Sequence, residues 1–278
     1  MSSVKQEASK VASNPAVGIF IRIGDGARGY LFLVVGLLAL LLALGKISQT
    51  LDYQGAIAAT AANPLGKFLL IIVLIGLVFY VLWALAAALF DLLHVGHDLK
   101  SLFKRAVLLI GAVIYGLLIP MLVVYIRGGS SQTGSQNFSV AKLATTIFLL
   151  PGGKWLVAIV GATLIVGGLI TVYSGFRRNF DKEVRSYSLS AGQVTWIKRA
   201  GRFGTLAYGA VIVVIGVLFF AAFTNADPLK ATGIDGALLS LIKLPFGRWL
   251  LGLMGLGLIS YGIYLAMKGL WFRTRSSK

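Results

Sequence analysis

Long stretches without a charged residue alternate with short polar segments along the whole chain. Six stretches are long enough to cross a bilayer as a helix, which takes roughly 17 to 25 residues. They cover residues 29–45, 68–90, 106–126, 155–176, 203–223 and 249–267. The pattern predicts an all-α fold, a polytopic membrane helix bundle with six transmembrane helices. A shorter apolar run at 17–23 is expected to lie on the membrane surface as an interfacial helix.

Glycine recurs at seven-residue spacing inside these apolar stretches. An α-helix returns to nearly the same face after seven residues, so each set forms a stripe without side chains. Membrane helices use such stripes to bring their backbones together. The glycines expected to pack helices are Gly29, Gly36, Gly161, Gly168, Gly175, Gly209, Gly216, Gly255, Gly262 and Gly269.

Composition agrees with a membrane protein, since 58% of the residues are hydrophobic and only 13% are charged. A water-soluble domain cannot bury that much apolar surface, whereas a bilayer can solvate it. The chain contains no cysteine, which excludes a disulfide framework and a thiolate site.

The basic residues are distributed unevenly between the connections. The two termini and the even-numbered connections hold 18 of the 26 Lys and Arg. This bias predicts that both termini face the cytoplasm. The residues expected to contact anionic lipid headgroups, or alternatively an acidic partner, are Arg177, Arg178, Lys182, Arg185, Lys198, Arg199 and Arg202. Nucleic acid is not expected, because no recognisable binding fold accompanies these residues.

A five-residue motif, Pro-x-Gly-cation-aromatic, precedes the second, fourth and sixth stretches; we call it the start motif. Proline suits the start of a helix, and the cation and the ring suit the headgroup interface. In each copy a short apolar segment precedes the motif, and these segments are expected to be brief helices on the external surface. The interfacial motif residues are Pro64, Gly66, Lys67, Phe68, Pro151, Gly153, Lys154, Trp155, Pro245, Gly247, Arg248 and Trp249.

The chain is therefore expected to contain three copies of a two-helix unit. Because each copy holds two spans, all three start on the same side of the membrane, which predicts parallel repeats around an approximate threefold axis. The expected parts are an N-terminal cytoplasmic segment (1–20), repeat 1 (21–98), repeat 2 (99–180), a basic cytoplasmic connection (181–198), repeat 3 (199–272) and a basic tail (273–278).

These repeats resemble domain-of-unknown-function family 1206, which comprises uncharacterised bacterial membrane proteins with tandem two-helix repeats. Besides the start motifs, the resemblance rests on Arg22, Gly24, Gly29, Tyr30 and Gly36 in the first copy and on Arg202, Gly204, Gly209 and Gly216 in the third. It implies a six-span architecture and a bacterial membrane, and it implies no activity. The expected location is the bacterial cytoplasmic (inner) membrane.

Ionisable residues are absent from the six stretches as bounded above, which argues against a carboxylate-driven pump. Ser174 and Ser260 have no base within their spans, so each is expected to hydrogen-bond a neighbouring helix. Asp91, His94, His97 and Asp98 follow the second stretch and could hold a divalent metal. The favoured interpretation of these four residues is a polar turn that ends the helix.

Several aromatic residues fall inside the stretches, namely Tyr80, Trp83, Tyr173, Tyr261 and Tyr264. They could line a cavity for a lipid, quinone or pigment, although packing or interfacial anchoring is the more common role of such rings.

These observations favour a protein without a catalytic site and without a cofactor. The preferred hypothesis is an accessory, scaffold or interaction subunit that binds membrane lipid and a larger membrane complex. One alternative is a channel or facilitator that passes a small solute along the threefold axis. A second alternative is a metal-dependent site at the end of the second span.

Overall fold

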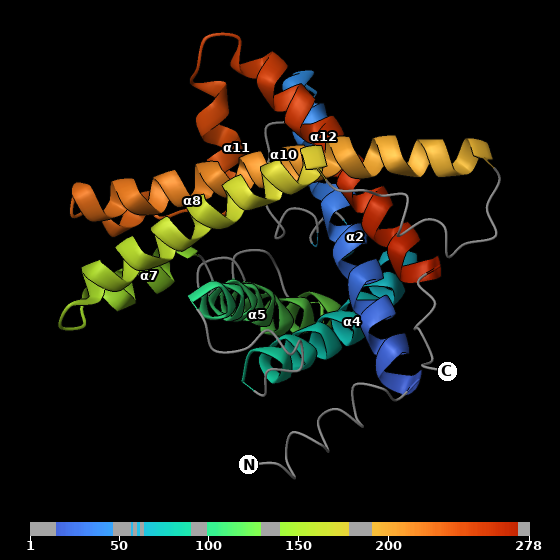
Figure 1. Cartoon of the computed structure of the whole chain (residues 1–278), viewed down its shortest axis with the longest axis horizontal. Helices are drawn as coiled ribbons and strands as arrows, with labels where there is room; N and C mark the ends of the chain where they lie inside the picture. The colour runs from blue at the N-terminus through green and yellow to red at the C-terminus, as the bar shows by residue number, and fades with distance from the viewer. Residues whose placement is uncertain are drawn as a thin grey trace.

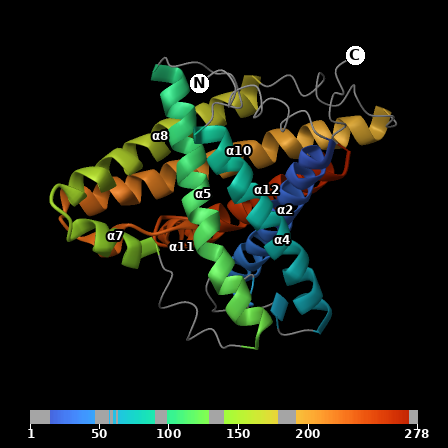
Figure 2. The ribbon, with the colours of Figure 1, turned by 90° about the horizontal axis from the view of Figure 1, so that it is seen from below.

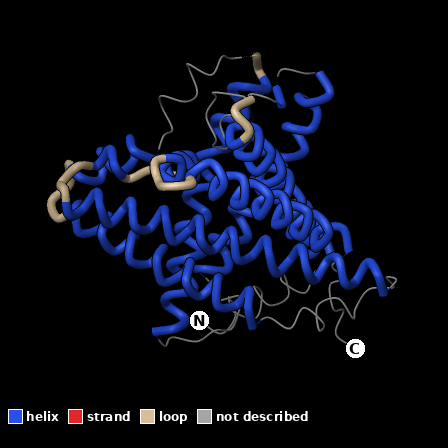
Figure 3. Tube along the Cα trace, turned by 90° about the horizontal axis from the view of Figure 1, so that it is seen from above, coloured by secondary structure: helices blue, strands red, loops and turns tan. Residues whose placement is uncertain are grey.

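The computed structural model describes residues 15–46, 57, 60–61, 64–89, 99–128, 140–177 and 191–271. All regular structure in these residues is helical (Figure 3). The helices are α2 (Pro15–Ala43), α4 (Pro64–Leu89), α5 (Leu99–Ile126), α7 (Val140–Phe148), α8 (Gly153–Arg177), α10 (Ala191–Thr224), the 3-10 helix η1 (Pro228–Lys230), α11 (Ile234–Ile242) and α12 (Gly247–Trp271).

Six of these helices are long and apolar enough to cross a membrane, which confirms the expected polytopic bundle. Their candidate spans are Gly24–Ala43, Gly66–Leu89, Arg105–Ile126, Gly153–Arg177, Val194–Thr224 and Gly247–Lys268. The expectation of a separate interfacial helix at 17–23 is wrong. These residues form one continuous helix with the first span, and no proline after Pro15 interrupts it before Ala43.

The long helices contact one another in a closed order, α2 to α4, α5, α8, α10, α12 and back to α2 (Figures 1 and 2). Helices α2 and α12 pack along their length, as do α8 and α10. The order is loosest between α5 and α8, where Gly167 lies near Phe103 and Val107. Spans that follow one another in the sequence are therefore adjacent in the bundle, and the contact between α2 and α12 places the first span beside the last.

Glycine makes the α2–α12 contact a contact between backbones. A Cβ atom at Gly36 would lie 2.7 Å from the carbonyl oxygen of Gly255, and one at Gly262 would lie 2.6 Å from that of Gly29. Since real Cβ atoms do not approach other atoms below 3.0 Å, no larger residue fits at these positions without a shift of the helices. The pairs Gly29–Gly262 and Gly36–Gly255 run in opposite directions along the two helices, as antiparallel packing requires.

The α8–α10 contact has the same construction. A Cβ atom at Gly168 would lie 2.9 Å from the carbonyl oxygen of Gly209, and one at Gly216 would lie 2.9 Å from that of Gly161. Gly175 faces the side chain of Leu206 instead. Two of the three contacts between successive repeats are therefore alike. At the third, between α4 and α5, a Cβ atom at Gly111 of α5 would lie 3.5 Å from the hydroxyl of Tyr80, a side-chain contact of ordinary length, and Gly116 has nothing within 4 Å.

The start motifs of the second and third copies share one local geometry. The motif glycines are Gly153 and Gly247, and each donates its N–H to the carbonyl oxygen three residues earlier at 2.9 Å. Each also lies so close to the carbonyl six residues earlier that a Cβ atom would clash with it. Gly66 of the first copy lies against the carbonyl of Thr60 in the same way. The aromatic residues Trp155 and Trp249 are exposed. The approximate threefold axis itself stays a prediction.

Short helices precede the motifs in the described parts of the second and third copies, as expected. These are α7, between the third and fourth spans, and α11, between the fifth and sixth. Helix α11 buries Ala237 and Leu238 in the core, so one of its faces packs inward. The core between the long helices is mostly apolar, with Phe32, Leu77, Met121, Leu122 and Leu258 fully buried, and Asp25 and Thr205 are its buried polar residues among those described.

Candidate functional site

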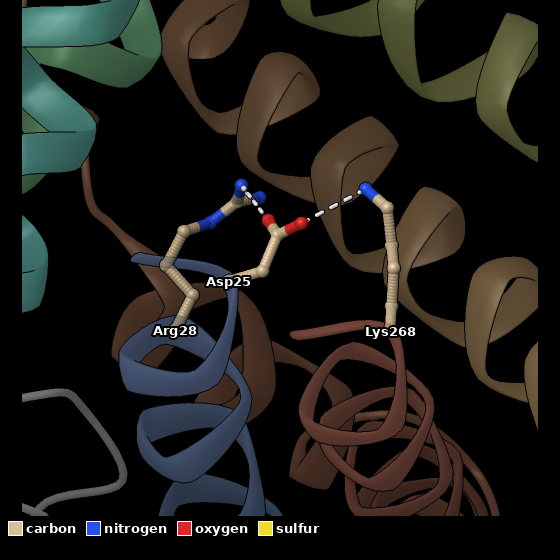
Figure 4. Close-up of polar contacts among 3 residues, drawn as sticks. All are labelled: Asp25, Arg28 and Lys268. Carbon is tan, nitrogen blue, oxygen red and sulfur yellow. Dashed lines mark hydrogen bonds and ion pairs between the residues drawn. The ribbon is translucent and has the colours of Figure 1, made fainter. Parts of the chain in front are cut away.

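Three charged residues from the two ends of the chain meet inside the bundle (Figure 4). Asp25 and Arg28 lie one turn apart on α2, and Lys268 lies near the end of α12. Because α2 and α12 pack antiparallel through their glycines, the start of one helix adjoins the end of the other. The glycine stripe therefore positions the charges.

The carboxylate of Asp25 lies between two cations. Arg28 Nη1 donates a hydrogen bond to Asp25 Oδ1 at 3.4 Å, and Lys268 Nζ lies 3.0 Å from Asp25 Oδ2. The Asp25 side chain is 8% exposed, that of Arg28 is 13% exposed and that of Lys268 is 31% exposed. In Figure 4 the two cationic side chains reach the carboxylate from opposite sides. Lys268 forms the outer edge of this triad.

Tyrosine rings surround the guanidinium of Arg28. Its Cζ lies 4.4 Å from the ring centroid of Tyr80 on α4 and 5.2 Å from that of Tyr115 on α5. The two rings pack edge-to-face, with their centroids 5.1 Å apart. The ring faces attract the cation electrostatically, more so where water is excluded. Four helices (α2, α4, α5 and α12) thus contribute to one charged and aromatic cluster.

A second group of rings extends the cluster towards α10. Tyr208 on α10 and Tyr261 on α12 stack with centroids 4.4 Å apart, and Phe32 meets both edge-on at 5.1 Å. Offset stacking and edge-to-face contacts are the favourable geometries of aromatic pairs. We call the charged triad together with Tyr80, Tyr115, Tyr208 and Tyr261 the Arg28 cluster.

The expectation that the spans lack ionisable residues needs correction at this point. The first span begins at Gly24 rather than Gly29, and the last extends to Lys268, so both include charges that the sequence pattern assigned to connections. Arg28 and Lys268 are also two of the 18 basic residues counted as topology signals. The six stretches were defined as runs without charged residues, so a charge at the end of a span was assigned to a connection even where it is buried. The definition therefore missed Asp25, Arg28 and Lys268. Asp25 and Arg28 lie three residues apart in a glycine-rich segment, and this i, i+3 spacing was the sequence feature that indicated a contact between them.

Comparison between the first and third copies shows that Asp25 and Arg28 are particular to the first repeat, while Lys268 comes from the third. A shift of 180 residues brings Asp25 onto Thr205 and Arg28 onto Tyr208. Thr205 is buried, and its hydroxyl oxygen has no hydrogen-bond partner among the described residues. In contrast, the second helices of the two copies correspond at a shift of 181 residues, which brings Pro64 onto Pro245 and Tyr80 onto Tyr261. Gly204 packs against Tyr261 as Gly24 packs against Tyr80. The first and third repeats therefore share a scaffold, on which the first carries Asp25 and Arg28 and the third carries Lys268.

The N-terminal part of α10 presents the other candidate surface. Trp196, Arg199, Arg202 and Phe203 are exposed, while Ile197 is buried. Lys198 is half-buried and Arg177 is exposed at the end of α8. Arg178, Lys182 and Arg185, which were expected to join these cations, lie outside the described residues.

The structure separates the remaining candidate aromatic residues. Tyr264 is buried beside Tyr261 at 6.4 Å, and Trp83 lies 6.1 Å from Tyr80, so these rings adjoin the Arg28 cluster. Tyr173 is 58% exposed and contacts Arg177.

The prediction for the two serines is wrong. Ser174 and Ser260 donate to carbonyl oxygens of their own helices, those of Thr171 and Leu256, because a hydroxyl reaches the preceding turn more easily than a neighbouring helix.

The candidate metal ligands Asp91, His94, His97 and Asp98 lie outside the described residues. Within the part of the chain that the structure describes, no three His, Cys, Asp or Glu residues are grouped so that they could hold a metal ion.

Comparison with known proteins agrees with this architecture. Residues 23–91 and 203–271 each match the protein family described as Domain of Unknown Function (DUF1206). These two segments correspond to the α2–α4 and α10–α12 hairpins. The chain is also 32% identical over 272 residues to "Uncharacterized protein YxxB" of Bacillus subtilis (strain 168), an alignment that covers 98% of this chain and 95% of the relative. No solved structure matches the chain. The chain is a multi-pass membrane protein that belongs to the DUF1206 family.

Proposed function

We propose that the protein is a non-catalytic membrane scaffold that binds anionic lipid on the cytoplasmic side and serves as an accessory subunit of a larger membrane complex. The proposal places it in a bacterial cytoplasmic membrane with both termini in the cytoplasm. The observation that carries the proposal is the exposed basic and aromatic surface at the start of α10, formed by Trp196, Arg199 and Arg202.

This surface lies at the end of a helix that is longer than the bilayer requires. Helix α10 has 34 residues and therefore a length of about 51 Å, compared with a hydrocarbon thickness of about 30 Å. Its first turns reach the headgroup region when the rest of the helix crosses the membrane. A tryptophan with exposed arginines is the composition typical of that region.

Electrostatic attraction favours anionic lipid at this place. Each Lys or Arg close to an anionic leaflet contributes about 1 kcal/mol of attraction. The 3.6-residue period brings Trp196 and Arg199 to the same side of α10, and Arg202 lies one further turn along. A ring at headgroup depth and cations beside it can contact one leaflet together.

The packing of the bundle supports a scaffold rather than a solute pathway. The helix pairs α2–α12 and α8–α10 touch backbone to backbone at their glycines, which leaves little space between them. The fully buried side chains among the described residues include Phe32, Leu77 and Leu258, which offer no polar lining to a solute, and the charges of the Arg28 cluster lie at one end of the spans rather than along them.

Co-purification tests the proposal. The full-length protein would be extracted from its membrane in polymer nanodiscs, and the retained lipids and proteins would be quantified by mass spectrometry. We expect anionic phospholipid to be enriched over its share of the membrane. The double variant Arg199→Gln with Arg202→Gln should lose that enrichment, whereas Arg248→Gln, an exposed cation at the other end of the bundle, should retain it.

A protein that retains neither enriched lipid nor a partner would refute the proposal. Enrichment that survives the double variant would refute the assignment to α10. If the wild-type protein retains enriched anionic lipid but no protein partner, lipid binding would be supported and the role as an accessory subunit would be refuted.

A further inference from the structure

The guanidinium of Arg28 is buried with more hydrogen-bond donors than the described residues use. An arginine has five N–H donors and stays protonated in proteins. Asp25 accepts from Nη1 at 3.4 Å, which is long for a charge-assisted hydrogen bond. The Nε of Arg28 is buried and has no hydrogen-bond partner among the described residues.

The surrounding rings do not use the N–H donors at the edge of the guanidinium. Tyr80 and Tyr115 interact with Arg28 through their ring faces, which balances part of its charge without accepting its N–H groups. In-plane donors in this fork geometry match the oxygens of a carboxylate or a phosphate, which arginine binds in a bidentate manner. Asp25 accepts a hydrogen bond only from Nη1 and so does not form a bidentate pair with the guanidinium.

The position of the cluster in the fold restricts the ligand further. Asp25 is the second residue of the first span and Lys268 is the last residue of the sixth, so the triad lies where the spans meet the headgroup region. Lys268 is the most exposed of the three side chains and marks the side from which the cluster can be reached. The phosphates of a bilayer lie at this depth, next to the end of the hydrocarbon core.

We propose that the Arg28 cluster is a binding site for a phosphate oxyanion. Arg28 holds the phosphate oxygens through its N–H groups, and Lys268 adds a positive charge at the outer edge. Asp25 competes with the ligand, because its carboxylate occupies the same cations while the site is empty. The phosphate is carried either by an anionic phospholipid or by a free phosphate ion. This site is distinct from the α10 surface and does not depend on the proposed function.

Binding would be measured on the full-length protein, delipidated in a neutral detergent, by native mass spectrometry and calorimetric titration. Two probes separate the sources, namely inorganic phosphate and dioctanoyl phosphatidylglycerol. The variants are Arg28→Met, which keeps an apolar stem without donors, and Asp25→Asn, which removes the competing charge. Arg248→Met is the control for an exposed cation.

We expect Arg28→Met to weaken binding about tenfold or more, because hydrogen bonds to a charged group are lost. Asp25→Asn should strengthen binding several-fold, and Arg248→Met should leave it unchanged. If the triad were only a structural ion pair, the Asp25→Asn substitution would not strengthen phosphate binding. If Arg28→Met does not fold, Arg28→Lys keeps the charge but loses the fork, and it should also weaken binding.

Binding of the lipid probe alone assigns the site to a headgroup, and binding of inorganic phosphate assigns it to the free ion. Three results would each overturn the proposal. The first is that the wild type binds neither of the two probes, and the second is that wild type and the Arg28 variants bind equally. The third is that Asp25→Asn binds as the wild type does or more weakly. Lipid enrichment through Arg199 and Arg202 is measured on different variants, so either proposal can fail without the other.

Discussion

Replacing Gly262 by alanine places one methyl group where α2 and α12 touch. The added Cβ would lie 2.6 Å from the carbonyl oxygen of Gly29 and 2.8 Å from the amide nitrogen of Leu33. Both atoms belong to the backbone of α2, so no side-chain rotation can relieve the contact. The two helices have to move apart instead.

The size of the effect follows from that separation. Ordinary van der Waals contact for a Cβ atom begins at 3.4 Å, so the backbones must separate locally by about 0.8 Å. A gap of this size removes a quarter to a half of the dispersion energy of the contacts beside it. Overpacking of this kind costs about 1–3 kcal/mol, and we expect a value of about 2–3 kcal/mol because the obstacle is backbone. Gly262→Leu should cost more.

The measurement is the free energy of unfolding in mixed micelles, supported by the midpoint of thermal unfolding in detergent. Gly116→Ala is the matched control, because a Cβ atom there meets nothing within 4 Å. Its stability should stay close to wild type. Replacing the half-exposed Leu256 by methionine should also cost little, since the volume is conserved.

Coupling between positions gives the sharper test. Gly29→Ala should destabilise for the same reason as Gly262→Ala, and the double variant should cost less than the two single costs added together, because one separation of the helices relieves both contacts. Gly168→Ala lies at the other glycine interface and should be additive with Gly262→Ala. Wild-type stability of Gly262→Ala, or additive costs at Gly29 and Gly262, would refute close backbone packing.

Three further predictions concern the start motifs and the topology. Phe246 has φ +60° where the second copy has Gly152, so Phe246→Gly should stabilise the protein by about 1 kcal/mol in the same unfolding assay; a loss of stability would contradict a strained turn. Gly153→Ala should destabilise by about 2–3 kcal/mol, because the motif leaves no room for a Cβ atom, and a fully stable variant would argue against the shared motif geometry. In intact cells, a cysteine at Ser131 should react with a membrane-impermeant maleimide and one at Ser188 should not; the reverse pattern would invert the topology.

Much of the architecture follows from the sequence alone. Six apolar stretches, seven-residue glycine spacing and the start motif depend on local periodicity and composition, which do not change when the chain folds. Membrane insertion and the glycine-bearing face of each helix are therefore determined within each segment. The sequence also showed that the copies correspond, since equivalent positions carry equivalent residues.

Only the tertiary structure decided which stripes meet. Gly29 could pair with any of the stripes in the chain, and its pairing with Gly262 depends on the order of all six helices around the bundle. That pairing brings Asp25 and Arg28 from one end of the chain to Lys268 at the other. The spacing of Asp25 and Arg28 is a local feature of one helix, but the rest of the Arg28 cluster could not be predicted from the sequence. The proximity of these two residues to Lys268 and to the tyrosines is a property of helix packing that no single segment specifies.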